Sequence, residues 1–168
     1  NGSRNEHSDY KTADGYRVSN TRFNETNFNT AIGFNNELIS SSLRFIFNHS
    51  NIGLPEEIEE QSTSKTMETP YQDLTTKMLS FNNSIFLGNS KITAIGGYSM
   101  NQRKEFEGHH HHEGEHEEEH HQETLTPSIL LKLETYSYDV KWHLPKGKNL
   151  ETIIGVQGML QKNKNEGE

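Results

Sequence analysis

The chain has 168 residues, with 16 Lys and Arg against 24 Asp and Glu, which gives a formal net charge of -8. Apolar residues make up 29% of it, below the share of about 45 to 50%, counted with Gly, in a typical globular domain, so a large conventional core is not expected. Cysteine is absent, which excludes disulfides and thiolate metal sites. The sequence holds neither the roughly 18 consecutive apolar residues of a spanning helix nor an opening signal segment, so we interpret it as a mature chain or an internal fragment.

Apolar residues recur at every second position along most of the chain, which is the pattern of a β-strand with one apolar and one polar face. The first nine residues are interpreted as the tip of an earlier strand. The alternation then predicts six strands of roughly ten or more residues, and residues 162–168 are expected to enter another loop. The six alternating segments begin at Phe28, Ile39, Leu79, Ile92, Tyr136 and Leu150.

The connections between the predicted strands alternate in length. Tight turns built from Gly, Pro and Asn are expected at 35–38, 88–91 and 145–149. Long loops are expected at about 8–27, 49–74 and 101–127, and the last two of these are strongly acidic. Short turns at one end and long loops at the other are typical of bacterial outer-membrane barrels. We therefore predict an all-β fold, an antiparallel up-and-down transmembrane β-barrel segment of about six strands.

A soluble antiparallel sandwich or lipocalin-like barrel would show the same period with its apolar face turned inward. The loop asymmetry, the strand lengths and the charged opposite face, with Arg44, Asp139 and Lys141, favour the membrane barrel. Trp142 beside its turn, and Tyr136 and Tyr138 farther along the strand, fit the aromatic girdles of such barrels.

The segment 105–123, EFEGHHHHEGEHEEEHHQE, holds seven of the ten histidines and eight acidic residues but no Lys or Arg. Without it the chain has 24 - 8 = 16 acids against 16 bases, so this segment carries the whole net charge. Imidazole and carboxylate are the ligands of zinc and related divalent cations, and neutral imidazole is free to coordinate. The candidate metal ligands are His109, His110, His111, His112, Glu113, Glu115, His116, Glu117, His120 and His121.

Two other interpretations of the same segment are a metalloprotease motif and a solvated tract without a ligand. His112–His116 and His116–His120 both fit the H-E-x-x-H motif of metalloproteases, but a tract of His and Glu produces this spacing by chance and no apolar helix face surrounds it. We therefore expect no enzymatic activity. A solvated acidic tract that binds nothing is the other alternative. Glu56, Glu57, Glu59 and Glu60 of the preceding acidic loop fit either a negative mouth that concentrates cations or plain solvation of the loop.

The arrangement of these motifs resembles the barrel portion of TonB-dependent outer-membrane receptors over nearly the whole chain. The resemblance lies in the segments DYKTADGYRVSNTRFNETNFNTAIGF, HSNIGLPEEI, NQRKEFEGHHHHEGEHEEEHHQE, LETYSYDVKWHL and ETIIGVQGMLQKNKNEGE. It implies a Gram-negative outer-membrane location with the long loops outside, roughly 22 strands in the complete barrel, a plug domain, and a TonB complex as partner. The 168 residues contain neither plug nor TonB motif, so residues 1–168 are expected to be a partial barrel domain.

Receptors of this family that carry a Glu/His-rich loop are associated with metal uptake. The resemblance therefore implies that this chain captures zinc or another divalent metal for energised import. The expected partners are outer-membrane lipid, the metal and the TonB complex, with no nucleic acid and no required cofactor. A siderophore or oligosaccharide as cargo, with the loop as an accessory, stays open as an alternative. A secreted soluble β-domain that buffers metal is the alternative from another class of protein.

Overall fold

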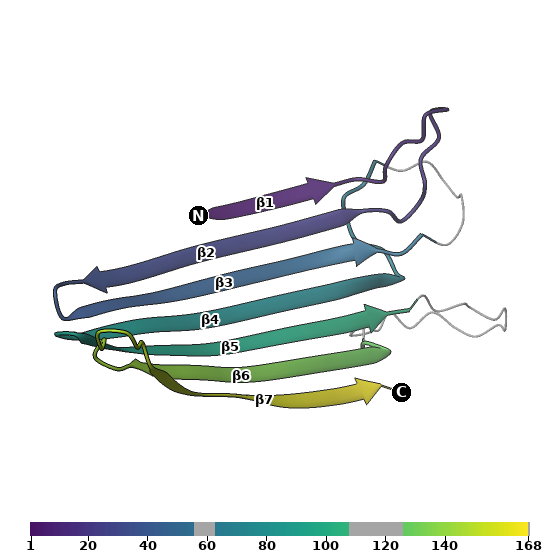
Figure 1. Ribbon diagram of the computed structural model, residues 1–168. Helices are drawn as coiled ribbons and strands as arrows, with labels where there is room; N and C mark the ends of the chain where they lie inside the picture. Colours follow the sequence, from purple (N-terminus) through teal and green to yellow (C-terminus); the bar gives the residue numbers. More distant parts are fainter. Residues whose placement is uncertain (56–62, 108–125, 168) are drawn as a thin grey trace.

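The computed structural model describes residues 1–55, 63–107 and 126–167. These residues form one antiparallel sheet of seven strands, and each strand pairs with the next one along the chain (Figure 1). The all-β, up-and-down arrangement predicted from the alternation is confirmed, and the sheet is open. The strands are β1 (Gly2–His7), β2 (Phe23–Asn35), β3 (Ile39–Gly53), β4 (Tyr71–Leu87), β5 (Ser90–Phe106), β6 (Ile129–His143) and β7 (Ile153–Gly167).

The alternation of short and long connections is also confirmed. Residues 36–38, 88–89 and 144–152 join strands at one end of the sheet, which we call the turn end. Residues 8–22, 54–70 and 107–128 join strands at the opposite end, the loop end (Figure 1). Gly88 allows its turn to be tight because its φ of 62° suits a residue without a side chain. In the first turn the Asn36 side chain accepts the backbone N–H of Leu38 and of Ile39, at 2.9 and 2.7 Å.

Several predicted boundaries are wrong, and most of the errors lie at the loop end. The first residues form a full strand, β1, paired with β2, so there are seven strands and not six. The ladder continues through residues predicted as loop at 23–27, 49–53, 71–74 and 101–106. Residues 162–167, predicted to enter a loop, continue β7 opposite β6, whereas β7 begins at Ile153 and not at Leu150. Backbone pairing needs no apolar side chain, so it continues where the apolar alternation stops.

The register places the alternating side chains in continuous rows on each side of the sheet. Paired residues of an antiparallel sheet share a face, so one row contains Ile39, Ile85, Ile92, Trp142 and Ile154. Another row of the same face contains Phe45, Leu79, Tyr98, Tyr136 and Leu160. We call this side the apolar face. On β3 the apolar side chains of this face run from Ile39 to Phe47, over nine residues.

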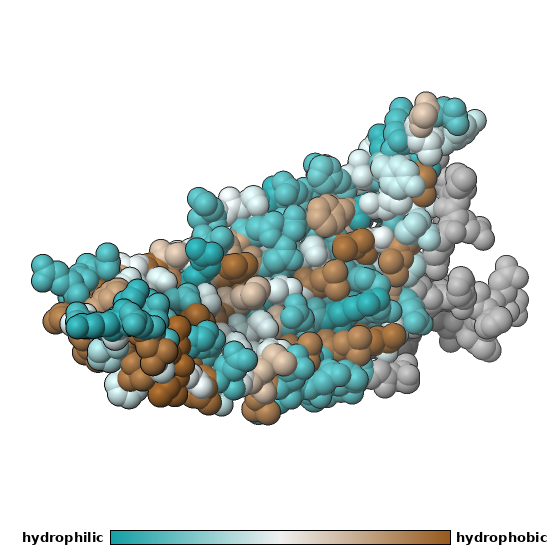
Figure 2. All heavy atoms as spheres, in the orientation of Figure 1, coloured by the Kyte–Doolittle hydropathy of each residue, from teal (hydrophilic) through white to brown (hydrophobic). Residues whose placement is uncertain are grey.

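The opposite side, the polar face, carries most of the Asn and Ser residues of the strands. Arg44, Asp139 and Lys141 lie there, as predicted, and the Lys141 ammonium donates to Asp139 at 2.7 Å. In Figure 2 hydrophilic residues are spread over much of the visible side, with apolar groups among them and a larger apolar area toward the turn end.

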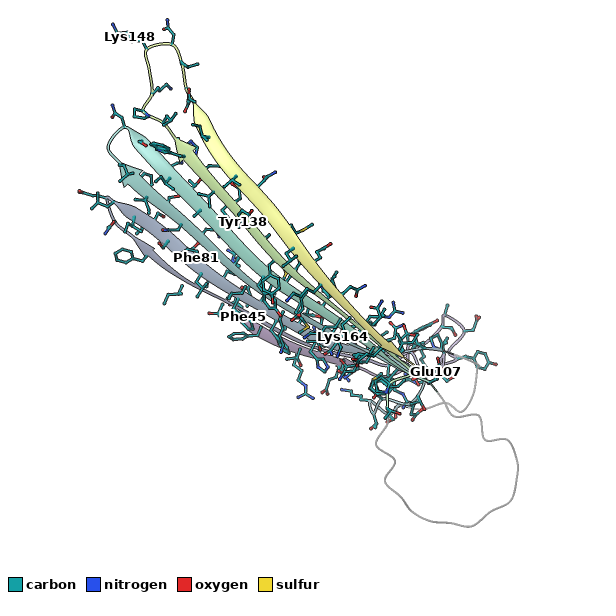
Figure 3. All side chains as sticks on the ribbon, turned by 90° about the horizontal axis from the view of Figure 1, so that it is seen from below. Phe45, Phe81, Glu107, Tyr138, Lys148 and Lys164 are labelled. Carbon is teal, nitrogen blue, oxygen red and sulfur yellow. The ribbon has the colours of Figure 1, made fainter. Side chains whose placement is uncertain are left out.

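The described residues contain almost no hydrophobic core, in line with the low apolar content. Met100 and Phe106 are the only buried hydrophobic side chains among them. Figure 3 shows Phe45, Phe81 and Tyr138 along the sheet between Lys148 at the turn end and Glu107 at the loop end. On the apolar face the exposed large residues are Phe28, Ile32, Phe34, Ile39, Leu43, Leu79, Phe81, Leu87, Tyr136, Tyr138, Val140, Trp142, Ile154, Val156 and Leu160.

We predict that residues 162–167 are paired with β6 in the folded chain. Because the chain has no cysteine, Leu133→Cys with Asn163→Cys introduces one pair of directly opposed thiols. Mild oxidation in detergent at low protein concentration should join them, as seen by mass spectrometry after proteolysis. The control pair, Leu133→Cys with Lys162→Cys, differs by one residue but lies on opposite faces. Equal cross-linking of both pairs would contradict the register.

Candidate functional site

The ten metal ligands predicted from the sequence lie outside the described residues. These are His109, His110, His111, His112, Glu113, Glu115, His116, Glu117, His120 and His121. The acidic residues Glu56, Glu57, Glu59 and Glu60 lie outside them as well. The structure does define where the His/Glu segment joins the sheet, because β5 ends at Phe106 and β6 begins at Ile129, both at the loop end.

The two ends of the β5–β6 connection are held side by side. Both the backbone N–H and the hydroxyl of Ser128 donate to the carbonyl of Glu105, at 2.8 and 3.1 Å. Phe106 is buried beside Tyr71 of β4, with ring centroids 4.6 Å apart and planes 17° from parallel. The stacked pair fixes the last residue of β5 against its neighbour. The His/Glu segment is therefore attached to a rigid base.

Arg22 forms a buried ion pair within the β1–β2 connection and also contacts the β3–β4 connection. The Arg22 guanidinium contacts the Asp9 carboxylate at 3.3 Å, and both side chains are almost completely buried. Arg22 also pairs with Glu68 and donates to the carbonyl of Thr66 at 2.7 Å. Burial disfavours the charged guanidinium, but Glu68 and Asp9 outweigh this and raise the pKa of Arg22 above its ordinary value. Arg22 thus connects two loops that are far apart in the sequence.

Asn20 makes a second connection between the same two loops. Its side-chain amide donates to the carbonyls of Leu54 and Pro70, at 3.0 and 2.7 Å. Asn20 adopts a left-handed backbone with φ of 52°, a conformation that Asn tolerates better than most residues. The close approach also requires Gly53, because a Cβ there would lie 2.5 Å from the carbonyl oxygen of Asn20. Asn20 and Arg22 thus hold the two loops together at the loop end. We call Asp9, Asn20 and Arg22, with their partners in residues 54–70, the Asp9–Arg22 platform.

Sequence reasoning missed this platform. Asp9, Asn20 and Arg22 lie in a polar stretch that was predicted to be loop, and the partners of Asn20 and Arg22 in the other loop follow 34 to 50 residues later. The turn-forming residues near Asn20 are a weak signal, but nothing in the sequence indicates which loop it would contact.

The three remaining histidines lie apart from one another. The His7 ring stacks on Phe23 with centroids 6.1 Å apart. His49 Nε2 lies 3.2 Å from the Asp73 carboxylate. His143 ends β6 at the turn end, on the polar face. No group of three or more His, Asp or Glu that could hold a metal ion is present in the described part of the chain.

Comparison with known proteins gives no relative for this chain. No family model, no curated protein and no solved structure matches it. Within residues 1–55, 63–107 and 126–167, no helix has the length and apolarity needed to cross a membrane.

We predict that Asp9 holds Arg22 in the position from which its guanidinium reaches Glu68 and Thr66 of the other loop. Asp9→Asn keeps the side-chain shape but leaves the buried guanidinium with less negative charge, at a cost of about 3 kcal/mol. Hydrogen–deuterium exchange should then increase in residues 8–22 and 63–70. The control Asp14→Asn removes the same charge from an exposed position of the same loop and should leave exchange unchanged. Equal exchange in the two variants would show that the pair does not fix the loops.

Proposed function

We propose that this chain is part of an outer-membrane β-barrel receptor of the TonB-dependent type, and that it captures zinc or a related divalent cation through its His/Glu-rich external segment. The observation that carries the proposal is the exposed apolar face. Its rows of Ile, Leu, Val and aromatic side chains run across β2–β7 without a covering element among the described residues. A soluble monomer rarely exposes an apolar patch above about 300 to 600 Å².

Lipid is the cover that fits this face best. The apolar rows end toward the loop end, where polar and charged residues replace them on the same strands. Aromatic rings lie near both borders of the apolar rows: Tyr98 and Tyr136 toward the loops, and Trp142 toward the turns. Such a band with aromatic borders is typical of outer-membrane barrels. In the alternative of a secreted soluble domain, a further layer of protein would have to cover this face.

The open edges of the sheet support a place within a larger barrel. β1 and β7 each pair with one neighbour, so each has a free row of backbone donors and acceptors. In a membrane these groups must be satisfied, which requires further strands on both sides. The polar face would then line the lumen, where Arg44, Asp139 and Lys141 meet water.

The position of the His/Glu segment supports metal capture as the function of the loop end. The segment holds seven imidazoles and eight carboxylates, and it connects β5 to β6 at the loop end. Side chains of these two types bind zinc without a thiolate. The negative charge of the segment would also concentrate cations near the barrel mouth.

We predict that an arginine on the apolar face weakens the membrane-embedded fold. Phe81→Arg, near the middle of β4, should cost about 2 to 4 kcal/mol in lipid, measured by urea unfolding in vesicles. Ser84→Arg adds the same charge to the polar face of the same strand and should have little effect. A Phe81→Arg chain that is equally stable, and more soluble without detergent, would favour the soluble alternative.

We predict that zinc binding depends on the His/Glu segment. Isothermal titration calorimetry of the full chain with zinc should show binding that is lost when the seven histidines between 109 and 121 are changed to Ala. The matched control changes His7, His49 and His143 to Ala and should bind as the parent does. Binding should weaken toward about pH 6, because protonated imidazole cannot coordinate.

Two outcomes of the titration would contradict metal capture: no heat of binding with the parent chain, or equal binding after the seven histidines are replaced. If zinc binds, an uptake assay with the complete receptor under zinc limitation separates metal import from a siderophore or oligosaccharide cargo. Growth that does not depend on the seven histidines would favour the other cargoes.

A further inference from the structure

Three lysines gather on the apolar face near the loop end. Lys132 of β6 lies directly opposite Lys164 of β7. Lys162 lies two residues from Lys164, on the same face, opposite Glu134. We call Lys132, Lys162 and Lys164 the lysine cluster. Figure 3 shows Lys164 on the part of the sheet nearest the loop end.

The cluster begins where the apolar rows stop. On β6 and β7 the last apolar pair is Tyr136 with Leu160, and the next pair on this face is Glu134 with Lys162. The ring of Tyr136 lies 5.0 Å from that of Tyr98, whose hydroxyl donates to Glu134 at 2.9 Å. Aromatic rings therefore separate the apolar rows from the lysines. In the proposed membrane orientation this border is the depth of the lipid headgroups.

The charge of this border differs in sign from that of the whole chain. Across β4–β7, three rows of the apolar face hold five lysines and three acids, a balance of 5 - 3 = +2, whereas the chain carries -8. The same rows on β1–β3 hold one Arg and one Glu. The net positive charge of this border therefore lies on β4–β7. The five lysines are Lys77, Lys104, Lys132, Lys162 and Lys164, and the acids are Asp73, Glu134 and Glu166.

The carboxylates of the sheet neutralise the cluster only in part. Lys132 pairs with Glu134 at 3.2 Å, and Lys164 pairs with Glu166, in each case along its own strand. Lys162 lies opposite Glu134 and interacts with its carboxylate through charge, without a salt bridge to any residue of the described part of the chain. Like charges directly opposite each other destabilise a strand pair. An anion between the strands would remove this repulsion.

We propose that the lysine cluster binds the phosphate group of an anionic lipid in the leaflet next to the long loops. This inference rests on the proposed membrane location. Each Lys ammonium offers three N–H donors to phosphate oxygens, and two of the three lysines approach from opposite strands. The adjacent Tyr136 and Leu160 would contact the start of the acyl chains, which a free phosphate lacks.

The test uses the full chain folded in detergent micelles that contain phosphatidic acid or, in parallel, phosphatidylcholine. Native mass spectrometry counts the lipid molecules that stay bound. The parent chain should retain phosphatidic acid in preference to phosphatidylcholine. Changing Lys132, Lys162 and Lys164 to Gln should weaken that binding by on the order of tenfold to a hundredfold, because each lysine near a membrane surface adds about a factor of five.

The matched control changes Lys141, Lys146 and Lys148 to Gln, which removes the same charge from the polar face and the turn end. It should bind phosphatidic acid as the parent does. Equal loss in the two triple variants, or no preference of the parent for phosphatidic acid, would overturn the proposal while leaving the membrane location intact. Displacement of the lipid by excess inorganic phosphate would also overturn it in favour of a free-anion site. A chain that enters neither micelle nor vesicle would overturn the membrane location and the lipid site together.

A second measurement does not depend on retention of lipid in the spectrometer. Lys164→Gln relieves the repulsion with Lys132 and removes an exposed ion pair of little value, so it should raise the unfolding temperature in phosphatidylcholine micelles. In phosphatidic acid the same change removes a lipid contact and should lower it. A shift of the same sign in both micelles would contradict the proposal.

Discussion

The structure depends on one constraint: every strand from β2 to β7 alternates apolar and polar side chains, and the register aligns these alternations into continuous rows. A slip of one residue between two strands would move a whole apolar set to the other face. This alternation specifies the register strongly once the apolar face is covered, because the described residues themselves bury only Met100 and Phe106 as hydrophobic side chains. Stability must come from the backbone ladder and from whatever covers the apolar face, which is why the proposed function begins with lipid.

The two ends of the sheet differ in structure in a way that fits two different surroundings. At the turn end the strands join through short connections such as residues 36–38 and 88–89. At the loop end the connections are long, and two of them are held together by Arg22 and Asn20 through contacts with Glu68, Thr66, Leu54 and Pro70. The platform lies beside the attachment of the His/Glu segment, because Tyr71, which follows Pro70, stacks on Phe106 at the end of β5. In the proposed orientation, the lysine cluster marks the membrane border on the lipid-facing side of the sheet.

Most of the fold could be predicted from the sequence because the strand period is a local property. Tyr136, Tyr138, Val140 and Trp142 indicate their face without reference to any other strand. The strand ends could not be predicted, because Asn24, Asn51 and Lys164 continue the ladder through backbone pairing while their side chains interrupt the apolar pattern. The Asp9–Arg22 pair and the Lys132–Lys164 opposition depend on tertiary contacts or on register, and neither has a local signal. The His and Glu residues proposed as metal ligands lie outside the described residues, so their role remains a prediction.

The most direct test of the central claim is a spin-label scan along β4 in lipid vesicles. Because the chain has no cysteine, single Cys substitutions at residues 77–86 each carry one nitroxide. Collisions with oxygen, which enters lipid, and with a water-soluble nickel chelate are measured by electron paramagnetic resonance. The account predicts a period of two, with oxygen favoured at odd positions such as Leu79 and Phe81, and the chelate favoured at even positions such as Asn82 and Ser84. No alternation, or chelate access highest at the odd positions, would contradict it.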